Sequence, residues 1–335
     1  MNRSGWAAGL RMLTGLGILV VLVWHLGSDA FLNGLRRIDA ATLLAALGIG
    51  LLTTVCSAWR WCLVARGLGL RLSLRRAVAD YYRALFLNAA LPGGVWGDVH
   101  RAIGHGRSAG DLGRGVRAVV LERTAGQLAL FVVGAAVLLA RPSPVLAPVT
   151  RFLTSPGVAL PAAVLGVLVI AASCRLRRRR GASRGERALR TVVSEARQGL
   201  LARGVWPGVA LSSVAVLAGY LAMFVLAARV AGVTAPTAEL VPLVVLALLA
   251  MALPLNVGGW GPREGVAAWA FGAAGLGAAQ GLTSAVIYGV LAFAASLPGA
   301  AVLLARWAPG LRTERPQFEL EERVLAEQGA PQRRT

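Results

Sequence analysis

The chain has 335 residues, of which 56% are hydrophobic and 15% are charged, and its mean hydropathy is +0.65. A soluble globular protein is less apolar than this, so the composition excludes that class and predicts a polytopic membrane protein. The net charge of +20 comes from 35 basic residues, all arginine, and these lie in loops between apolar stretches, which argues against a nucleic-acid-binding protein.

Apolar stretches of about 18 or more residues are long enough to cross a hydrocarbon core of about 30 Å as helices. The first is read as a retained helix, because no small-residue cleavage site of a signal peptide follows it. The sequence therefore predicts an all-α protein with six spanning helices. In chain order these are Leu10 to Gly27, Ala40 to Val64, Val119 to Ala140, Val158 to Cys174, Val205 to Ala228 and Gly281 to Ala305.

The stretch NAALPGGVWGDVHR, from Asn88 to Arg101, interrupts the apolar pattern with a proline, three glycines and charges. It predicts a broken helix in which Asp98 lies one turn before Arg101. Glu122 and Arg123 follow in the next apolar span. Because an ionised side chain at the bilayer centre costs roughly 3 kcal/mol, these charges are expected to face the protein interior and to pair, Glu122 with Arg123 or with a neighbouring helix. Asp98 has a second interpretation, as the N-cap of a short helix.

A second stretch, MALPLNVGGWGPREG from Met251 to Gly265, has the same order of Leu-Pro, glycines, Trp-Gly and charge. Its glycines free the backbone, and Pro262 suits the first position of a new helix. Such a helix start presents unpaired N–H groups and a positive dipole end, which favour a phosphate. Arg263 and Glu264 follow directly and are expected to pair.

The arginine-rich block from Cys174 to Gly204 fixes the orientation, because short basic loops stay in the cytoplasm. Contact with anionic lipid head groups is the alternative interpretation of this block. Counting spans from it places both termini in the cytoplasm, and places Arg36 and Arg37 outside, against the same rule. Each broken stretch then enters and leaves by one face, as a re-entrant pair or as two crossing helices. The two stretches approach from opposite sides, which is typical of an inverted-repeat transporter.

Three motifs carry a resemblance to a known family: FLNAALPGGVWGDVHR, VVLERTAG from Val119 to Gly126, and ALPLNVGGWGPREG. Over roughly Leu10 to Ala305 the chain resembles the flippase-like family, also described as the lysylphosphatidylglycerol synthase transmembrane region. The resemblance implies a bacterial inner-membrane protein that moves an anionic phospholipid or a polyprenyl-phosphate-linked lipid between leaflets. Residues 1–310 would form this membrane domain, and residues 311–335 a short cytoplasmic tail, helical or disordered. The tail is too short for the aminoacyl-transferase domain of some members, so synthase activity is not expected.

The resemblance also implies site residues. Arg101, Arg123 and Arg263 would bind the lipid phosphate, and Asp98, Glu122 and Glu264 would hold these arginines. Pro262 departs from the family pattern, which leaves the local helix start open. The broken-helix motif would consist of Pro92, Gly93, Gly94, Gly97, Gly259 and Gly261.

No nucleophile elbow, nucleotide-binding loop or metal-binding spacing occurs in the sequence, so we expect no catalytic residue, cofactor or metal. The expected partners are membrane lipids, with no nucleic acid. One alternative is a membrane scaffold that transports nothing and docks a glycosyltransferase or another lipid-modifying enzyme through its arginine-rich loop. Another is an intramembrane transferase that uses Asp98 or Glu264 as a base.

Overall fold

The structure is a computed structural model, and it describes residues 36–91, 94–140, 194–252 and 261–307. These residues form helices and contain no strand, which confirms the predicted all-α class. The helices in this part of the chain are α3 (Ala40–Gly67), α4 (Leu74–Ala90), α5 (Trp96–Ser108), α6 (Leu112–Ala140), α10 (Trp206–Val230), α11 (Thr237–Met251), α12 (Pro262–Ala273), α13 (Ala278–Ser296) and α14 (Pro298–Trp307).

Among the described residues, four helical stretches are long and apolar enough to cross a membrane, namely Ala40–Gly67, Leu112–Ala140, Trp206–Val230 and Ala278–Ala305. They match four of the six predicted spans, and the other two, Leu10 to Gly27 and Val158 to Cys174, lie outside the described residues. α6 begins seven residues before the predicted Val119, because the carboxylate of Asp111 accepts from the backbone N–H of Arg114 at 2.9 Å and caps a polar first turn.

Both predicted breaks occur. The first lies between α4 and α5, which pack together, and the second lies between α11 and α12, which also pack together. These four helices have 17, 13, 15 and 12 residues, and each is shorter than the roughly 20 residues that a span needs. Their lengths favour re-entrant pairs over crossing helices.

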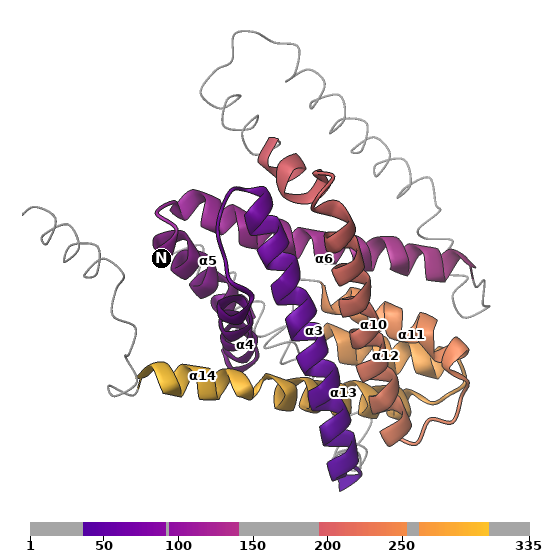
Figure 1. The fold of residues 1–335 in the computed structure, drawn as a ribbon. Coiled ribbons are helices and arrows are strands. Elements are labelled where there is room, and N and C mark those ends of the chain that lie inside the picture. Colours follow the sequence, from indigo (N-terminus) through magenta and orange to yellow (C-terminus); the bar gives the residue numbers. More distant parts are fainter. Residues whose placement is uncertain (1–35, 92–93, 141–193, 253–260, 308–335) are drawn as a thin grey trace, which may run out of the picture.

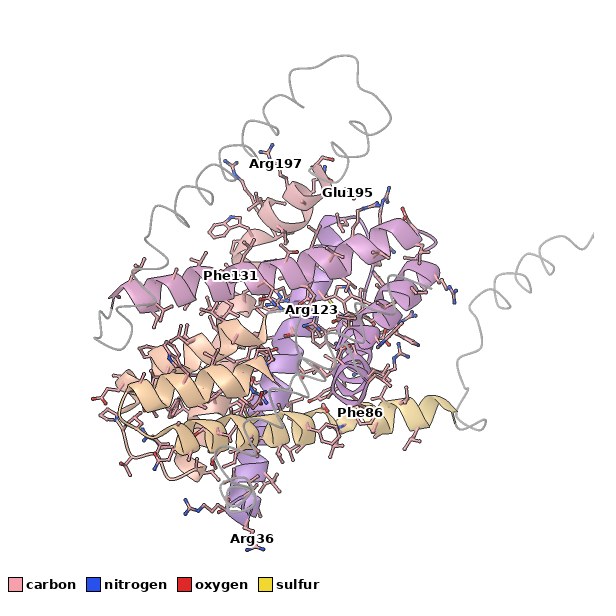
Figure 2. All side chains as sticks on the ribbon, turned by 180° about the vertical axis from the view of Figure 1, so that it is seen from behind. Arg36, Phe86, Arg123, Phe131, Glu195 and Arg197 are labelled. Carbon is pink, nitrogen blue, oxygen red and sulfur yellow. The ribbon has the colours of Figure 1, made fainter. Side chains whose placement is uncertain are left out.

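The two halves of the chain begin at opposite ends of the bundle. α3 and α10 pack side by side and run in opposite directions, with α6 and the α13–α14 run crossing them (Figure 1). In Figure 2, Arg36 lies at the end where α3 begins, and Glu195 and Arg197 lie at the other end, just before α10. This arrangement agrees with two halves of opposite orientation.

Three pairs of helix starts repeat at a constant interval, whereas α4 and α11, the fourth pair, begin 163 positions apart. In each of these three pairs the two helices begin 166 positions apart. The pairs are α3 and α10, which begin at Ala40 and Trp206, α5 and α12, which begin at Trp96 and Pro262, and α6 and α13, which begin at Leu112 and Ala278. The contacts correspond as well, since α5 packs on α6 as α12 packs on α13, and α3 packs on α13 as α6 packs on α10. The correspondence supports the predicted inverted repeat.

Glycines permit the closest helix contacts, and two of them are equivalent in the repeat. A Cβ atom on Gly115 would lie 2.4 Å from the Cα of Gly106 in α5, and one on Gly281 would lie 2.3 Å from the carbonyl oxygen of Ala267 in α12. Gly97 packs in the same way on α4, where a Cβ would lie 2.1 Å from the carbonyl oxygen of Ala84. We call α5 and α12, the short helices that follow the two breaks, the half-helices. Both therefore need small residues where they meet their neighbours.

Replacing Gly97 with alanine is expected to destabilise the protein by about 1–3 kcal/mol, because the added methyl group forces α5 away from the backbone of α4. The matched control is Gly104→Ala in the same helix, where nothing lies within 4 Å of the new Cβ. That change is expected to stabilise α5 by up to about 1 kcal/mol, because alanine is the better helix former. Thermal unfolding in detergent measures both, and a Gly97 variant as stable as the Gly104 variant would contradict the close contact.

Candidate functional site

Glu122 of α6 is fully buried and joins four helices. Its Oε1 accepts from the Nε and Nη2 of Arg60 in α3, at 3.0 and 2.6 Å, and from the hydroxyl of Tyr81 in α4 at 3.3 Å. Its Oε2 accepts from the Nη2 of Arg101 in α5 at 2.7 Å. A carboxylate inside a bilayer requires such partners, because an unpaired charge there is costly.

Asp98 of α5 forms the second half of the same network. Its Oδ1 accepts from the Nε of Arg101 at 2.8 Å and from the Nη2 of Arg123 in α6 at 2.8 Å. Its Oδ2 accepts from the side-chain amide of Asn88 in α4 at 3.0 Å, and the amide oxygen of Asn88 accepts from the N–H of Gly97 at 2.8 Å. Asn88 thus bridges the break between α4 and α5. Below, the ion network means Arg60, Asp98, Arg101, Glu122 and Arg123.

Aromatic rings surround the guanidinium groups of the ion network. The Cζ of Arg101 lies 4.5 Å from the ring centre of Tyr81 and 4.8 Å from that of Trp61, and the Cζ of Arg123 lies 5.6 Å from Tyr81. These distances are in the range of cation–π contacts.

Only one end of the ion network is accessible. The side chains of Arg60 and Arg101 are 4% and 0% exposed, whereas those of Asp98 and Arg123 are 18% and 37% exposed. Figure 2 shows Arg123 in the middle of the bundle. Arg123 is therefore the most exposed arginine of the ion network.

The structure tests the predicted ion pairs of Asp98 and Glu122 and the predicted N-cap role of Asp98. The pairing of Asp98 with Arg101 is confirmed, whereas Glu122 pairs with two neighbouring helices instead of with Arg123. The N-cap interpretation of Asp98 is wrong. α5 begins two residues earlier, after Val95, and the carboxylate of Asp98 is taken by arginines.

A smaller cluster lies at the start of α12, directly after the second break. Arg263 pairs with Glu264 as expected, through its Nε at 2.9 Å and also through its Nη2. The other oxygen of Glu264 accepts from the N–H of Gly261 at 2.7 Å, and the Cζ of Arg263 lies 4.9 Å from the ring centre of Tyr288. Gly261 has a φ of 119°, which favours glycine, and Pro262 is the first residue of α12. The departure at Pro262 thus fits the helix start.

The interval of 166 residues relates the two clusters. By this interval Glu264 is the equivalent of Asp98, and each is the third residue of its half-helix. Tyr288 of α13 is likewise the equivalent of Glu122 of α6. Tyr220 of α10 packs against the hydrophobic cluster that contains Tyr288. Each half-helix therefore begins with a carboxylate that holds an arginine.

Sequence reasoning missed Arg60, Tyr81, Asn88 and Ser213, whose hydroxyl accepts from the Nη1 of Arg60 at 3.2 Å. Arg60 had a detectable signal, because it is an ionisable residue inside the predicted span from Ala40 to Val64.

Of the predicted broken-helix residues, Gly94 is described and has a positive φ of 62°, whereas Pro92, Gly93 and Gly259 lie outside the described residues.

His105 follows Arg101 by one turn of α5 and packs edge-on against Trp61, with ring centres 5.4 Å apart. Burial lowers the pKa of His105 below its ordinary value of 6.5, and Arg76 acts in the same direction while Asp80 opposes it. As the pH falls through the ordinary value, the unfolded chain takes up a proton that the folded protein still refuses. Folding stability contributed by neutral His105 is therefore present above that pH and lost below it.

We accordingly expect His105→Gln to lose less stability than the intact protein when the pH is lowered from about 7.5 to about 5, across the histidine range. The thermal midpoint in detergent at both pH values measures this difference. His100→Gln is the control, because His100 lies on the same helix and is exposed. Equal pH dependence in the His105 and His100 variants would show that the burial of His105 does not matter.

Comparison with known proteins agrees with the geometry. The family model described as Lysylphosphatidylglycerol synthase TM region matches residues 8–299 of the chain. This range includes every residue of the ion network and both breaks, and it relates the chain to membrane proteins of lipid metabolism or transport. No curated protein matches the chain, and no solved structure does.

Proposed function

The chain belongs to the lysylphosphatidylglycerol synthase TM region family, and from this premise we propose that it moves a phosphate-bearing lipid between the two leaflets of a membrane. The lipid would be an anionic phospholipid or a polyprenyl-phosphate-linked lipid of a bacterial inner membrane. The single observation that carries the proposal is the ion network, in which five charged side chains meet between α3, α5 and α6.

Ionisable side chains inside membrane proteins mark the pathways of substrates and ions. Arginine is suited to a lipid phosphate because its planar group donates two parallel hydrogen bonds to the oxygens. Arg123 is the docking residue in this proposal, since it is the most exposed arginine of the ion network and its one ion-pair partner in the described part of the chain is Asp98. Asp98 and Glu122 hold the arginines while no lipid is bound.

The repeat supplies the second half of the proposed pathway. Glu264 accepts from the N–H of Gly261 at the start of α12, whereas at the start of α5 the N–H of Gly97 donates to Asn88, which donates to Asp98. The two halves begin at opposite ends of the bundle. We propose that each half-helix start receives the phosphate from its own leaflet. Exchange of partners by Arg123 and Arg263 would then accompany the passage of the head group.

The test is the movement of labelled phosphatidylglycerol between leaflets in proteoliposomes. We expect the Arg123→Gln variant to be slower by about ten- to hundredfold, because a charged hydrogen bond is worth about 1.5–3 kcal/mol. Arg117→Gln is the matched control, since Arg117 lies on the same helix, pairs with Glu195 and has a side chain that is 32% exposed. The control is expected to retain the intact rate.

Equal rates in the Arg123 and Arg117 variants would remove the ion network from the pathway. If the intact, folded protein moved no phosphate-bearing lipid at all, the transport proposal would fail. The scaffold alternative would then be tested by deleting residues 177–180 of the arginine-rich loop, which lie outside the described residues, and by measuring whether a lipid-modifying enzyme is still bound.

A further inference from the structure

The ion network has an excess of one positive charge. It holds three arginines and two carboxylates, which leaves +1. Arginine stays protonated in proteins, and each carboxylate contacts guanidinium groups, which favours its ionised form. Inside a bilayer such an imbalance is unfavourable unless a counter-charge approaches.

In the part of the chain that the structure describes, the neighbouring clusters do not supply the missing negative charge. Arg263 and Glu264 balance each other. On α4, Asp80 pairs with Arg83 and lies 3.9 Å from Arg76, whose side chain is 51% exposed. The two breaks themselves carry no ionisable side chain at residues 91–95 and 252–260 of the sequence.

The geometry points to a ligand with a single net negative charge, and we propose that the transported lipid is a phosphodiester and not a phosphomonoester or a zwitterion. This inference rests on the proposed function and narrows its substrate class. One negative charge brings the ion network to neutrality, whereas a phosphomonoester, with about −1.5 to −2 at pH 7, overshoots it. A zwitterionic head group leaves the excess positive charge in place.

Two donors are available for such a ligand, one exposed and one buried. Arg123 reaches solvent, and the Nη1 of the buried Arg101 has no hydrogen-bond partner in the described part of the chain. Both guanidinium groups already contact the same oxygen of Asp98. A buried donor without an acceptor is destabilising, so a ligand oxygen that reached Arg101 would be favourable.

The experiment compares three lipids with identical acyl chains in proteoliposomes of the full chain: phosphatidylglycerol, phosphatidate and phosphatidylcholine. We expect intact protein to move phosphatidylglycerol at least about tenfold faster than the other two, which corresponds to about 1.4 kcal/mol. Asp98→Asn raises the excess charge of the ion network by one, so its preference should shift toward phosphatidate. Arg123→Gln removes the excess, so its remaining movement should no longer favour phosphatidylglycerol over phosphatidylcholine.

The controls make the same charge changes outside the ion network, at Asp111→Asn and Arg117→Gln, and should keep the order of the intact protein. If intact protein moved the three lipids at equal rates, the inference would be overturned while the proposed function stood. If it moved none of them, the proposed function itself would fail. The ranking in the intact protein decides the inference even if the Asp98 variant does not fold, and an unchanged ranking in folded variants would also overturn it.

Discussion

Replacing Glu122 with glutamine is expected to lower the free energy of unfolding by roughly 3–5 kcal/mol, the usual cost of breaking a buried ion pair from one side. The variant leaves the guanidinium groups of Arg60 and Arg101 buried and without the carboxylate that both contact. Because Glu122 joins α3, α4, α5 and α6, the loss should loosen the whole first half. Thermal unfolding and the monodisperse fraction in detergent measure it.

The matched control is Glu195→Gln. Glu195 pairs with Arg117 across two helical segments, but the side chains of this pair are 14% and 32% exposed. An ion pair in contact with solvent contributes about 0–1 kcal/mol, so the control should lose little stability. The double variant Arg60→Gln with Glu122→Gln should cost less than the sum of its single changes, because the second change removes an unpaired charge. Losses of equal size at Glu122 and Glu195 would contradict the central role of Glu122.

Much of the fold follows from local sequence patterns. The apolar stretches predict four of the described helices, and the Leu-Pro-Gly stretches predict the breaks, because proline and glycine end helices wherever they occur. Pairing of Asp98 with Arg101 and of Arg263 with Glu264 is also local, since these residues are neighbours in sequence. Such features need no knowledge of how the helices pack.

The partners of Glu122 could not be predicted in this way. Arg60 and Tyr81 lie 62 and 41 positions away in sequence, and they meet Glu122 only because α3, α4 and α6 pack together. The equivalence of Asp98 and Glu264 was hidden for another reason. Aligning Trp96-Gly97 with Trp260-Gly261 places Asp98 opposite Pro262, whereas the helix starts shift the register by two residues. The backbone, not the motif, sets the correspondence.

The corresponding change in the second half, Glu264→Gln, is expected to lower the free energy of unfolding by roughly 3–5 kcal/mol as well. Glu264 is fully buried, and it is the carboxylate partner of Arg263 and the acceptor for the N–H of Gly261. Its loss removes the carboxylate that faces the buried guanidinium group of Arg263 at the start of α12. Lipid movement should fall by about tenfold or more, since a change of about 1.4 kcal/mol already gives that factor.

A control for Glu264 exists at the same position of the preceding helix. Glu239 is the third residue of α11, as Glu264 is of α12, but it is exposed. Glu239→Gln removes only a favourable interaction with the helix dipole, worth about 0.3–1 kcal/mol, and should keep the intact rate of lipid movement. If Glu264→Gln folded as well as the control and still lost lipid movement, Glu264 would act on the lipid pathway itself. If it folded and moved lipid at the intact rate, the second cluster would serve only the helix start, and the proposed pathway would be confined to the ion network.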